Sequence, residues 1–267
     1  MDDDLRPREC IDAQKAAAGL AEHGSGRRRP ERRHVDEPEH QRQHAERDRM
    51  RYQPASHDVA RLHVRLLLCT AAGRRIWLIG GTLPLWCEDE ARVYNTSLAY
   101  DPRGERVARY DKIHLFGFTR GTESYDESRT ILAGNTPASF EAPCGRVAMS
   151  VCYDLRFPEL YRQLAAAGGG TSLILMPAAF TYTTGQAHWE ILLRARAIEN
   201  QCYVLAAAQG GKHENGRRTW GHSMLIDPWG EVMAVLPEGE GVVSGLIDPA
   251  RLDEVRQNLP ALRHRVL

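Results

Sequence analysis

The amino-acid sequence predicts an α/β fold for most of this 267-residue chain. From about residue 76 onward, short apolar runs of strand length alternate with segments whose apolar residues recur at helical spacing. Glycine-bearing turns separate the two kinds of segment, and this alternation is typical of a sheet covered by helices. Residues 76–267 are therefore expected to form one α/β domain.

The expected elements follow one another in a regular order. Apolar runs predict strands at residues 76–81, 93–100, 105–110, 146–152, 172–177, 202–208 and 221–227. The turn Asp101–Gly104 makes the second and third of these a hairpin. A helix is predicted at 157–164, with proline near its start, and another at 188–200. The apolar face of this second helix is expected to comprise Ile191, Leu192, Ala195 and Ile198.

The first seventy-five residues have a different composition. They contain one of the nineteen aromatic residues of the chain, Tyr52. Thirty of residues 1–60 are charged or are histidines. A segment of this kind cannot bury enough apolar surface to offset the entropy lost on ordering. Residues 1–75 are therefore expected to be an atypical charged segment, separate from the domain at 76–267.

Charge and motif content exclude several classes of function. The net charge is zero, the pI is about 7.2 and acidic residues are interleaved with Arg27–Arg29, so no nucleic-acid partner is expected. No apolar run reaches the roughly 20 residues of a membrane span, and the acidic start does not resemble a signal peptide. We therefore expect a cytoplasmic protein without a membrane partner. Cysteine and histidine spacings match no metal site and no nucleotide motif is present, so neither a metal nor another cofactor is expected.

Cys152 is the first candidate for chemistry. It ends an apolar strand pattern and directly precedes a helix pattern, so a tight turn would expose its thiol at the edge of the sheet. Backbone N–H groups at such a turn stabilise both a thiolate and a developing oxyanion. The competing interpretation is a small buried core cysteine, but the polar neighbours Tyr153 and Arg156 favour the reactive role.

Lys112 and Glu127 are weaker candidates when each is taken alone. The chain has three lysines against thirty-two arginines, and Lys112 stands inside a mostly apolar run, which suggests that a compact ammonium is needed there. A surface lysine at the end of a strand is an alternative of equal weight. Glu127, by itself, is typical of a solvated loop carboxylate.

Taken together, three runs resemble the nitrilase, or carbon–nitrogen hydrolase, superfamily. They are Y-D-K-I-H-L-F from Tyr110, S-V-C-Y-D-L-R-F-P-E-L-Y-R from Ser150 and G-H-S-M-L-I-D-P-W-G-E-V from Gly221. The resemblance extends, in order, from about Ile76 to the last residue. It implies a nitrilase-type αββα sandwich that commonly dimerises through helices, so a homodimer is expected.

The resemblance also implies a catalytic set. Cys152 matches the nucleophile, Lys112 the catalytic lysine, and Glu127 a second glutamate that supports the lysine. In this chemistry the thiolate attacks an amide carbonyl, Lys112 and the backbone N–H of Tyr153 stabilise the oxyanion, and water hydrolyses the thioester. No cofactor takes part. Contacts that bind the oxyanion or the substrate are expected from Tyr153, Arg156, Phe180, Thr181 and His188.

One part of the family pattern is absent. Members begin with a strand bearing A-x-Q and continue to a strand ending in L-P-E, whose glutamate is the general base. Here the corresponding region is the charged segment, and Glu39 is the nearest imitation, without an apolar strand before it. The N-terminal strands and helix of the sandwich are therefore expected to be missing or replaced. Our hypothesis is that residues 1–75 are not native family sequence and arise from a shifted reading frame or a misassigned start.

The best match within the superfamily is the branch of deaminated-glutathione amidases and ω-amidases. The run from Ala187 to Gln209 is most similar to the former, which implies cysteine-dependent hydrolysis of a small carboxamide to a carboxylic acid and ammonia. Two alternatives stay open: an ω-amidase acting on 2-oxoglutaramate-type substrates, and a catalytically impaired binding protein with this fold.

Overall fold

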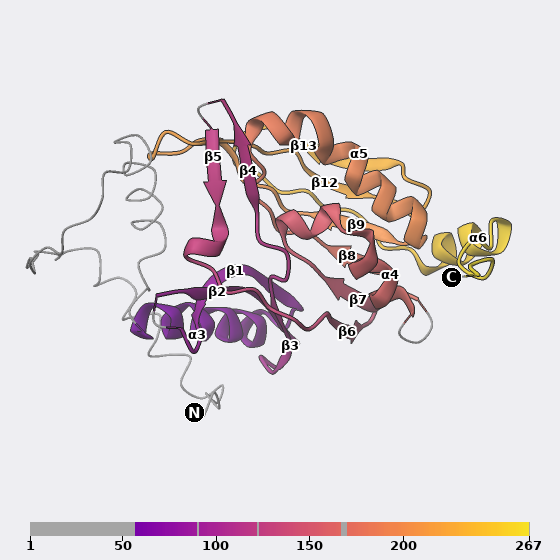
Figure 1. Cartoon of the computed structure of the whole chain (residues 1–267). Coiled ribbons are helices and arrows are strands. Elements are labelled where there is room, and N and C mark those ends of the chain that lie inside the picture. The colour runs from indigo at the N-terminus through magenta and orange to yellow at the C-terminus, as the bar shows by residue number, and fades with distance from the viewer. Residues whose placement is uncertain (1–56, 90, 122, 167–169, 267) are drawn as a thin grey trace, which may run out of the picture.

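The computed structural model describes residues 57–89, 91–121, 123–166 and 170–266. Two sheets lie face to face, and helices cover their outer faces (Figure 1). The smaller sheet is antiparallel and consists of β1 (Leu78–Trp86), β2 (Val93–Tyr100) and β3 (Arg106–Asp111), in that order. Helix α3 (His57–Arg74) packs against β1 and β2 from outside (Figure 1).

The larger sheet has six strands. These are β6 (Ala138–Ala142), β7 (Gly145–Met149), β8 (Leu173–Leu175), β9 (Tyr203–Ala206), β12 (Ser223–Ile226) and β13 (Val232–Leu236). Their order in space is β13-β12-β9-β8-β7-β6, and the central strands β7, β8 and β9 are parallel. Helix α4 (Pro158–Ala166) connects β7 to β8, and α5 (Tyr182–Asn200) connects β8 to β9. Both helices cover the outer face of this sheet (Figure 1).

Two hairpins and a terminal helix complete the described chain. The first hairpin is β4 (Gly117–Arg120) with β5 (Glu123–Asp126), followed by the 3₁₀ turn Glu127–Arg129. The second is β10 (Gly210–Lys212) with β11 (Arg218–Trp220), and α6 (Pro249–Asn258) follows β13. The sequence patterns did not predict either hairpin, β6, β13 or α6.

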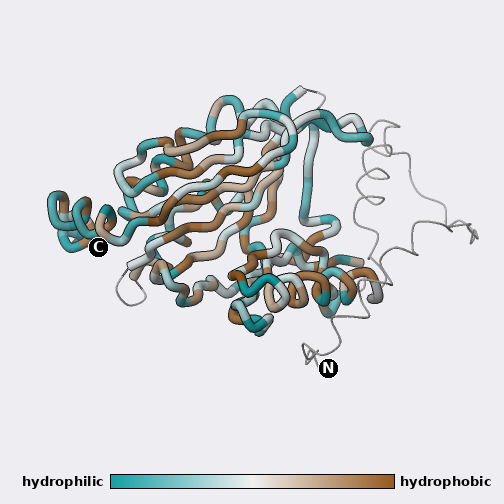
Figure 2. Tube along the Cα trace, turned by 180° about the vertical axis from the view of Figure 1, so that it is seen from behind, coloured by the Kyte–Doolittle hydropathy of each residue, from teal (hydrophilic) through white to brown (hydrophobic). Residues whose placement is uncertain are grey.

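The main core includes residues on both faces of the large sheet and extends to the small sheet. Ala99 and Tyr110 of the small sheet belong to one buried cluster with Val147 and Ile174 of the large sheet. Figure 2 shows apolar strands side by side across the large sheet. The resulting layer order, α3, small sheet, large sheet, then α4 with α5, confirms the predicted αββα sandwich.

Helix α3 forms a second, smaller core. Alternate residues of a strand point to opposite faces, so Leu98 and Tyr100 of β2 pack against Leu68 and Ala71 of α3. The composition of residues 1–75 did not predict this helix, because the high charge density of that segment hides the apolar run at 62–68. Helical spacing places most of these apolar residues on the small sheet, whereas Leu66 is 53% exposed.

The predicted apolar face of α5 is wrong. Ile191 and Ile198 are 70% and 49% exposed, whereas Trp189, Leu193 and Ala197 are completely buried. The helix carries apolar residues on two sides, and the buried side repeats at every fourth position. The helix also begins earlier than predicted, because the Thr181 hydroxyl caps its first turn by accepting from the Thr184 N–H.

Candidate active site

Cys152 lies where β7 gives way to a 3₁₀ turn, Cys152–Arg156, ahead of α4. Its φ is +52°, in the left-handed region that non-glycine residues seldom adopt. Its backbone N–H donates to the carbonyl of Pro177 at 3.0 Å, which ties the turn to the end of β8. The thiol is thereby held at the carboxyl edge of the parallel strands.

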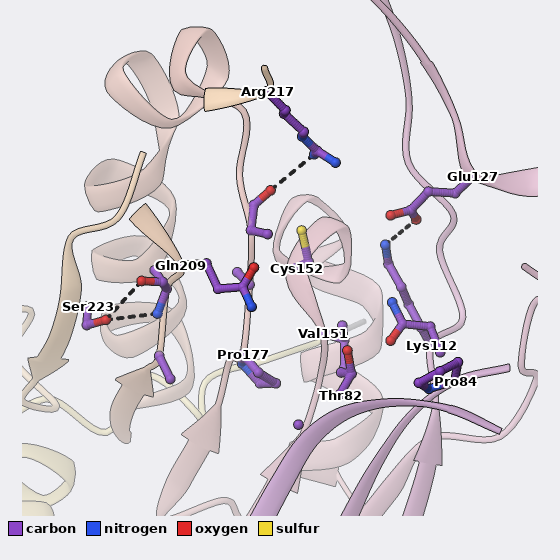
Figure 3. Close-up of a pocket in the computed structure, with 16 residues that line it drawn as sticks. Thr82, Pro84, Lys112, Glu127, Val151, Cys152, Pro177, Gln209, Arg217 and Ser223 are labelled. Atoms are coloured by element: carbon purple, nitrogen blue, oxygen red, sulfur yellow. Dashed lines mark hydrogen bonds and ion pairs between the residues drawn. The ribbon is translucent and has the colours of Figure 1, made fainter. Parts of the chain in front are cut away.

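A cavity of about 460 Å³ opens in front of this thiol (Figure 3). Both sheets line it. The small-sheet side contributes Gly81, Thr82, Pro84 and Asn95, and the large-sheet side contributes Val151, Pro177, Ala178, Gln209 and Ser223. Lys112, Glu127 and Arg217 complete the polar part of the wall. The cavity therefore lies between the two layers of the sandwich.

A narrow recess adjoins the cavity. Its wall includes Phe116, Tyr153, Phe180, Thr181 and Thr184. Four residues line both spaces: Glu127, Cys152, Ala179 and Arg217. A molecule bound in the cavity would therefore meet the thiol together with one carboxylate and one guanidinium.

Lys112 and Glu127 form an ion pair beside Cys152 (Figure 3). Lys112 follows β3 directly, and its side chain is completely buried. The ammonium donates to Glu127 Oε2, which also accepts the backbone N–H of Phe116 at 2.8 Å. The structure thus brings the three predicted catalytic residues, Cys152, Lys112 and Glu127, to one cavity.

The charges of this cluster act on one another. Burial, the largest effect, lowers the pKa of Lys112, but the negative charges of Cys152 and Glu127 outweigh it, so the pKa of Lys112 is raised overall. Lys112 therefore keeps its ammonium. Burial raises the pKa of Cys152, the Lys112 ammonium opposes that rise, and the Glu127 carboxylate adds to it. Lys112 is thus the neighbour that most favours the thiolate.

The residues predicted to contact the oxyanion or substrate divide into two groups. Tyr153, Phe180 and Thr181 line the recess. Arg156 and His188 do not belong to the wall of either space. Instead, Arg156 Nη1 lies 3.2 Å from His188 Nδ1, and its guanidinium stands over the ring of Phe180, 5.4 Å from the centroid.

Arg217 is a cavity residue that the sequence did not reveal. It enters the site from the hairpin β10–β11, where Nη2 donates to the carbonyl of Ala179 at 3.3 Å (Figure 3). The guanidinium also lies 4.8 Å from the ring centroid of Tyr125. Its place just before the G-H-S-M-L-I-D-P-W-G-E-V run was the available signal, but one arginine among thirty-two does not stand out.

Glu39, the weak candidate for a general base, lies outside the described residues. Within the described ranges, Glu127 is the one carboxylate in the walls of the cavity and the recess. The same residues contain no group of three His, Cys, Asp or Glu side chains arranged to hold a metal ion. No helix among them is long and apolar enough to span a bilayer.

Comparison with protein families gives a match that covers most of the chain. The family model described as carbon-nitrogen hydrolase matches residues 30–257. The chain belongs to this family. It is therefore a hydrolase acting on carbon–nitrogen bonds, as the sequence predicted. The match begins inside the segment 1–75, and the domain boundary at residue 75 stays a prediction.

Three individual proteins illustrate the relationship of this hydrolase. It is 44% identical over 196 residues to a deaminated glutathione amidase from Synechocystis sp., covering 72% of this chain and 71% of that protein. It is 41% identical over 191 residues to omega-amidase NIT2 from Homo sapiens, covering 71% and 68%. Saccharomyces cerevisiae Nit3, a member of the nitrilase superfamily, matches with a TM-score of 0.68 and 31% identity, covering 76% and 71%. These relatives confirm the predicted superfamily and fold.

Proposed function

We propose that this hydrolase is a cysteine-dependent amidase that converts a small carboxamide to a carboxylic acid and ammonia, and that it is most like the deaminated-glutathione amidases. The observation that carries the proposal is the cluster of Cys152, Lys112 and Glu127 at one cavity between the sheets. The similarity to two amidases supports it.

The reaction proceeds through a thioester on Cys152. The sulfur, with its proton removed, forms a bond to the carbonyl carbon of the amide. The Lys112 ammonium and the Tyr153 backbone N–H stabilise the resulting oxyanion. Collapse of this intermediate breaks the carbon–nitrogen bond, and the nitrogen takes up the proton that the thiol lost, transferred through water, and leaves as ammonia. Water then attacks the thioester, releasing the acid and regenerating the thiol. Glu127 holds Lys112 in place through its Oε2 atom.

A second candidate function is a binding protein of this fold that has lost most of its catalytic rate. It is favoured by the single carboxylate in the described cavity wall, Glu127, which is already engaged by Lys112. The two functions are separated by incubating purified protein with 2-oxoglutaramate and with deaminated glutathione. Formation of the product acid supports the amidase, and binding without product supports the alternative.

Arg217 supports a substrate that carries a carboxylate in addition to its amide. Its guanidinium lines both the cavity and the recess beside Cys152, and its planar array of donors suits bidentate binding of a carboxylate. Both the deaminated-glutathione and the ω-amidase assignments share this feature. Succinamate and butyramide are matched test substrates, because they have the same length and differ in the terminal carboxylate.

The expected result is selective. Arg217→Gln should lower kcat/KM for succinamate by about tenfold to a hundredfold, the range for a lost hydrogen bond to a charged group. Hydrolysis of butyramide should change little. Arg218→Gln is the matched control, because Arg218 stacks on Tyr182 and pairs with Glu238 away from the cavity. Equal losses on both substrates would contradict the assignment of Arg217.

We also propose that the protein is a cytoplasmic homodimer. Ile191, Ile198 and Trp229 are exposed apolar side chains on the outer side of α5 and the turn before β13. Arg194 Nε donates to the carbonyl of Gly230 at 2.8 Å, which holds that turn against the helix. Light scattering should give twice the chain mass for the wild type, and Ile191→Glu with Ile198→Glu should shift it to the monomer. Cell fractionation tests the location.

A further inference from the structure

Asp154, two residues after Cys152, is completely buried, and its carboxylate is surrounded by four hydrogen-bonding groups. Oδ1 accepts from the backbone N–H of His114 at 3.1 Å and lies 2.7 Å from His114 Nδ1. Oδ2 accepts from the Tyr110 hydroxyl at 2.7 Å and from the backbone N–H of Val151 at 2.8 Å. These contacts match the roughly four acceptor positions of a carboxylate.

The four contacts come from the two segments that carry the reacting groups. Tyr110 and His114 stand two residues before and two residues after Lys112. Val151 directly precedes Cys152, so its bond to Asp154 closes a loop around the nucleophile. One buried carboxylate therefore contacts a residue on each side of the lysine and closes the turn that contains the cysteine.

The loop around Cys152 depends on such a restraint. The left-handed φ of Cys152 is sparsely populated and persists when surrounding contacts enforce it. The bond from Val151 to Oδ2 spans this residue, and the Asp154 N–H donates back to the Val151 carbonyl at 3.1 Å. The His114 ring stacks on Phe157, with the ring centroids 3.8 Å apart. This contact holds the chain that follows the Cys152 turn against the lysine segment.

We propose that Asp154 is a positioning residue that sets the Lys112 ammonium relative to the Cys152 sulfur. The inference rests on the proposed function, in which this ammonium stabilises the oxyanion formed at that sulfur. Asp154 is not part of the wall of the cavity or the recess, so it does not touch the substrate. It acts through Tyr110, His114 and Val151.

The negative charge of Asp154 also supports its role in positioning Lys112. Burial lowers the pKa of Lys112, and Asp154 is one of the negative charges, after Cys152 and Glu127, that raise it overall. Burial, followed by the charge of Asp154, raises the pKa of Tyr110 far above its usual value, so Tyr110 stays protonated and remains a donor. The charge of Asp154 therefore favours the Lys112 ammonium, and its hydrogen bonds hold the segment that carries this ammonium.

The test uses variants that alter the Asp154 contacts to different degrees. Asp154→Asn removes the charge and replaces one acceptor oxygen by a donor, so it disturbs several contacts at once. Tyr110→Phe removes the hydrogen bond to Asp154 Oδ2, and with it the longer bond of 3.4 Å that the hydroxyl accepts from the Ile113 N–H, but it keeps the carboxylate itself. Tyr161→Phe is the matched control for Tyr110→Phe. Tyr161 is also fully buried, and its hydroxyl makes none of the four hydrogen-bonding contacts of Asp154.

The first readout is the split between kcat and KM on succinamate, or on whichever tested amide the wild type hydrolyses. Tyr110→Phe should lower kcat by about tenfold, the effect of one hydrogen bond to a charged group, with KM within about twofold. Asp154→Asn should lower kcat further, and Tyr161→Phe should change neither constant. Equal kcat for the two tyrosine variants, or a rise in KM alone, would overturn the inference.

The second readout does not require amide hydrolysis. The rate of alkylation of Cys152 by iodoacetamide is followed against pH, with and without Lys112→Met, in the wild-type, Tyr110→Phe and Tyr161→Phe backgrounds. Lys112→Met should raise the apparent pKa of Cys152 equally in the wild type and Tyr161→Phe, and by about half as much or less in Tyr110→Phe. An equal rise in all three backgrounds overturns the inference. If no amide is hydrolysed, the proposed function fails and this comparison still decides the role of Asp154.

Discussion

The two sheets that enclose the cavity differ in how they are covered. The large sheet packs against the small sheet on one face and against α4 and α5 on the other, where Trp189 and Leu193 are completely buried. The small sheet has α3 on its outer face, and the buried cluster there comprises Leu68, Ala71, Leu98 and Tyr100. The large sheet is therefore embedded in a much more extensive core.

The sheets also differ in which edge strands reach the cavity, because β1 of the small sheet lines it and β6 and β13 of the large sheet do not. Strand β1 stands at one end of the order β1-β2-β3, so it pairs with β2 alone among the described strands. It also supplies Gly81, Thr82 and Pro84 to the cavity wall. An edge strand presents unpaired N–H and C=O groups, which favours local opening and association with other chains.

This difference matters because each layer carries one reacting group. Cys152 follows β7 of the large sheet, and Lys112 follows β3 of the small sheet. Their separation depends on how the two layers sit against each other. The small layer is therefore expected to limit the integrity of the active site, although the nucleophile stands on the large one.

Restoring the N-terminal segment should have the largest effect on the solubility and the amidase rate, if the hypothesis of a shifted reading frame is right. Because residues 57–74 already supply the outer helix α3, we propose that another frame of the DNA encoding the part of residues 1–75 before α3, and its upstream flank, specifies an apolar strand with A-x-Q and a later one ending in L-P-E. A chain rebuilt with that segment should be more soluble and faster in amide hydrolysis, because it regains the general base and pairs the exposed edge. Absence of both motifs from every frame, with a soluble and active protein as written, would refute the hypothesis.

Lys112→Arg tests the contribution of the small layer to chemistry. The planar guanidinium cannot occupy the place of a compact ammonium, so kcat should fall by about a thousandfold, the upper range for one lost oxyanion donor. Lys212→Arg, at an exposed position on β10, is the matched control. Near-normal turnover by Lys112→Arg would make Lys112 a structural residue.

The pH dependence of Cys152 alkylation tests how the charges of Lys112 and Glu127 change the pKa of the thiol. Burial raises the pKa of Cys152, so alkylation by iodoacetamide should keep rising with pH beyond the usual thiol range. Lys112→Met removes the opposing positive charge and should move the profile to higher pH. Glu127→Gln removes a negative charge and should move it to lower pH. Shifts of the same sign in both variants would contradict the charge arrangement.

Labelling should also be selective among the cysteines. Cys202 is completely buried and burial raises its pKa to about 12, so it should stay unlabelled at neutral pH. Cys152 borders the cavity beside an ammonium and should react first. Mass spectrometry of the labelled peptides locates the probe, and faster labelling of Cys87 or Cys202 would defeat the assignment.

Amide hydrogen exchange should show the smallest effect, a difference between the layers within the native protein. Amides of α3 and β1 should exchange faster than those of β7 and β8, because fewer buried contacts oppose local opening of the small layer. Equal protection in both layers would show that the two sheets open as one unit.

Much of the large layer could be predicted from the sequence. The strands predicted at 172–177 and 202–208 contain β8 and β9, and Cys152 lies at the predicted strand-to-helix turn. Continuous apolar runs and turn residues are local signals, so they identify such elements well. The family resemblance then placed Lys112 and Glu127 at the same cavity, which spacing alone does not do.

The remainder depends on contacts between distant parts of the chain. Hairpin β10–β11 is short and polar, so its pattern did not reveal that Arg217 enters the cavity. Arg156 stands near Cys152 in sequence, but its guanidinium turns to Phe180 and His188. The four contacts of Asp154 join two motifs about forty residues apart, which no local pattern encodes.

Trapping the acyl-enzyme tests most directly whether the two layers cooperate in a thioester mechanism. Wild-type protein mixed with succinamate is quenched in acid and digested, and the mass of the Cys152 peptide is measured. The account predicts that this peptide gains the mass of the succinyl group, and that Lys112→Arg, which keeps Cys152, gives no adduct. Hydrolysis of the amide with the acyl group on another residue, or an undiminished adduct in Lys112→Arg, would contradict it.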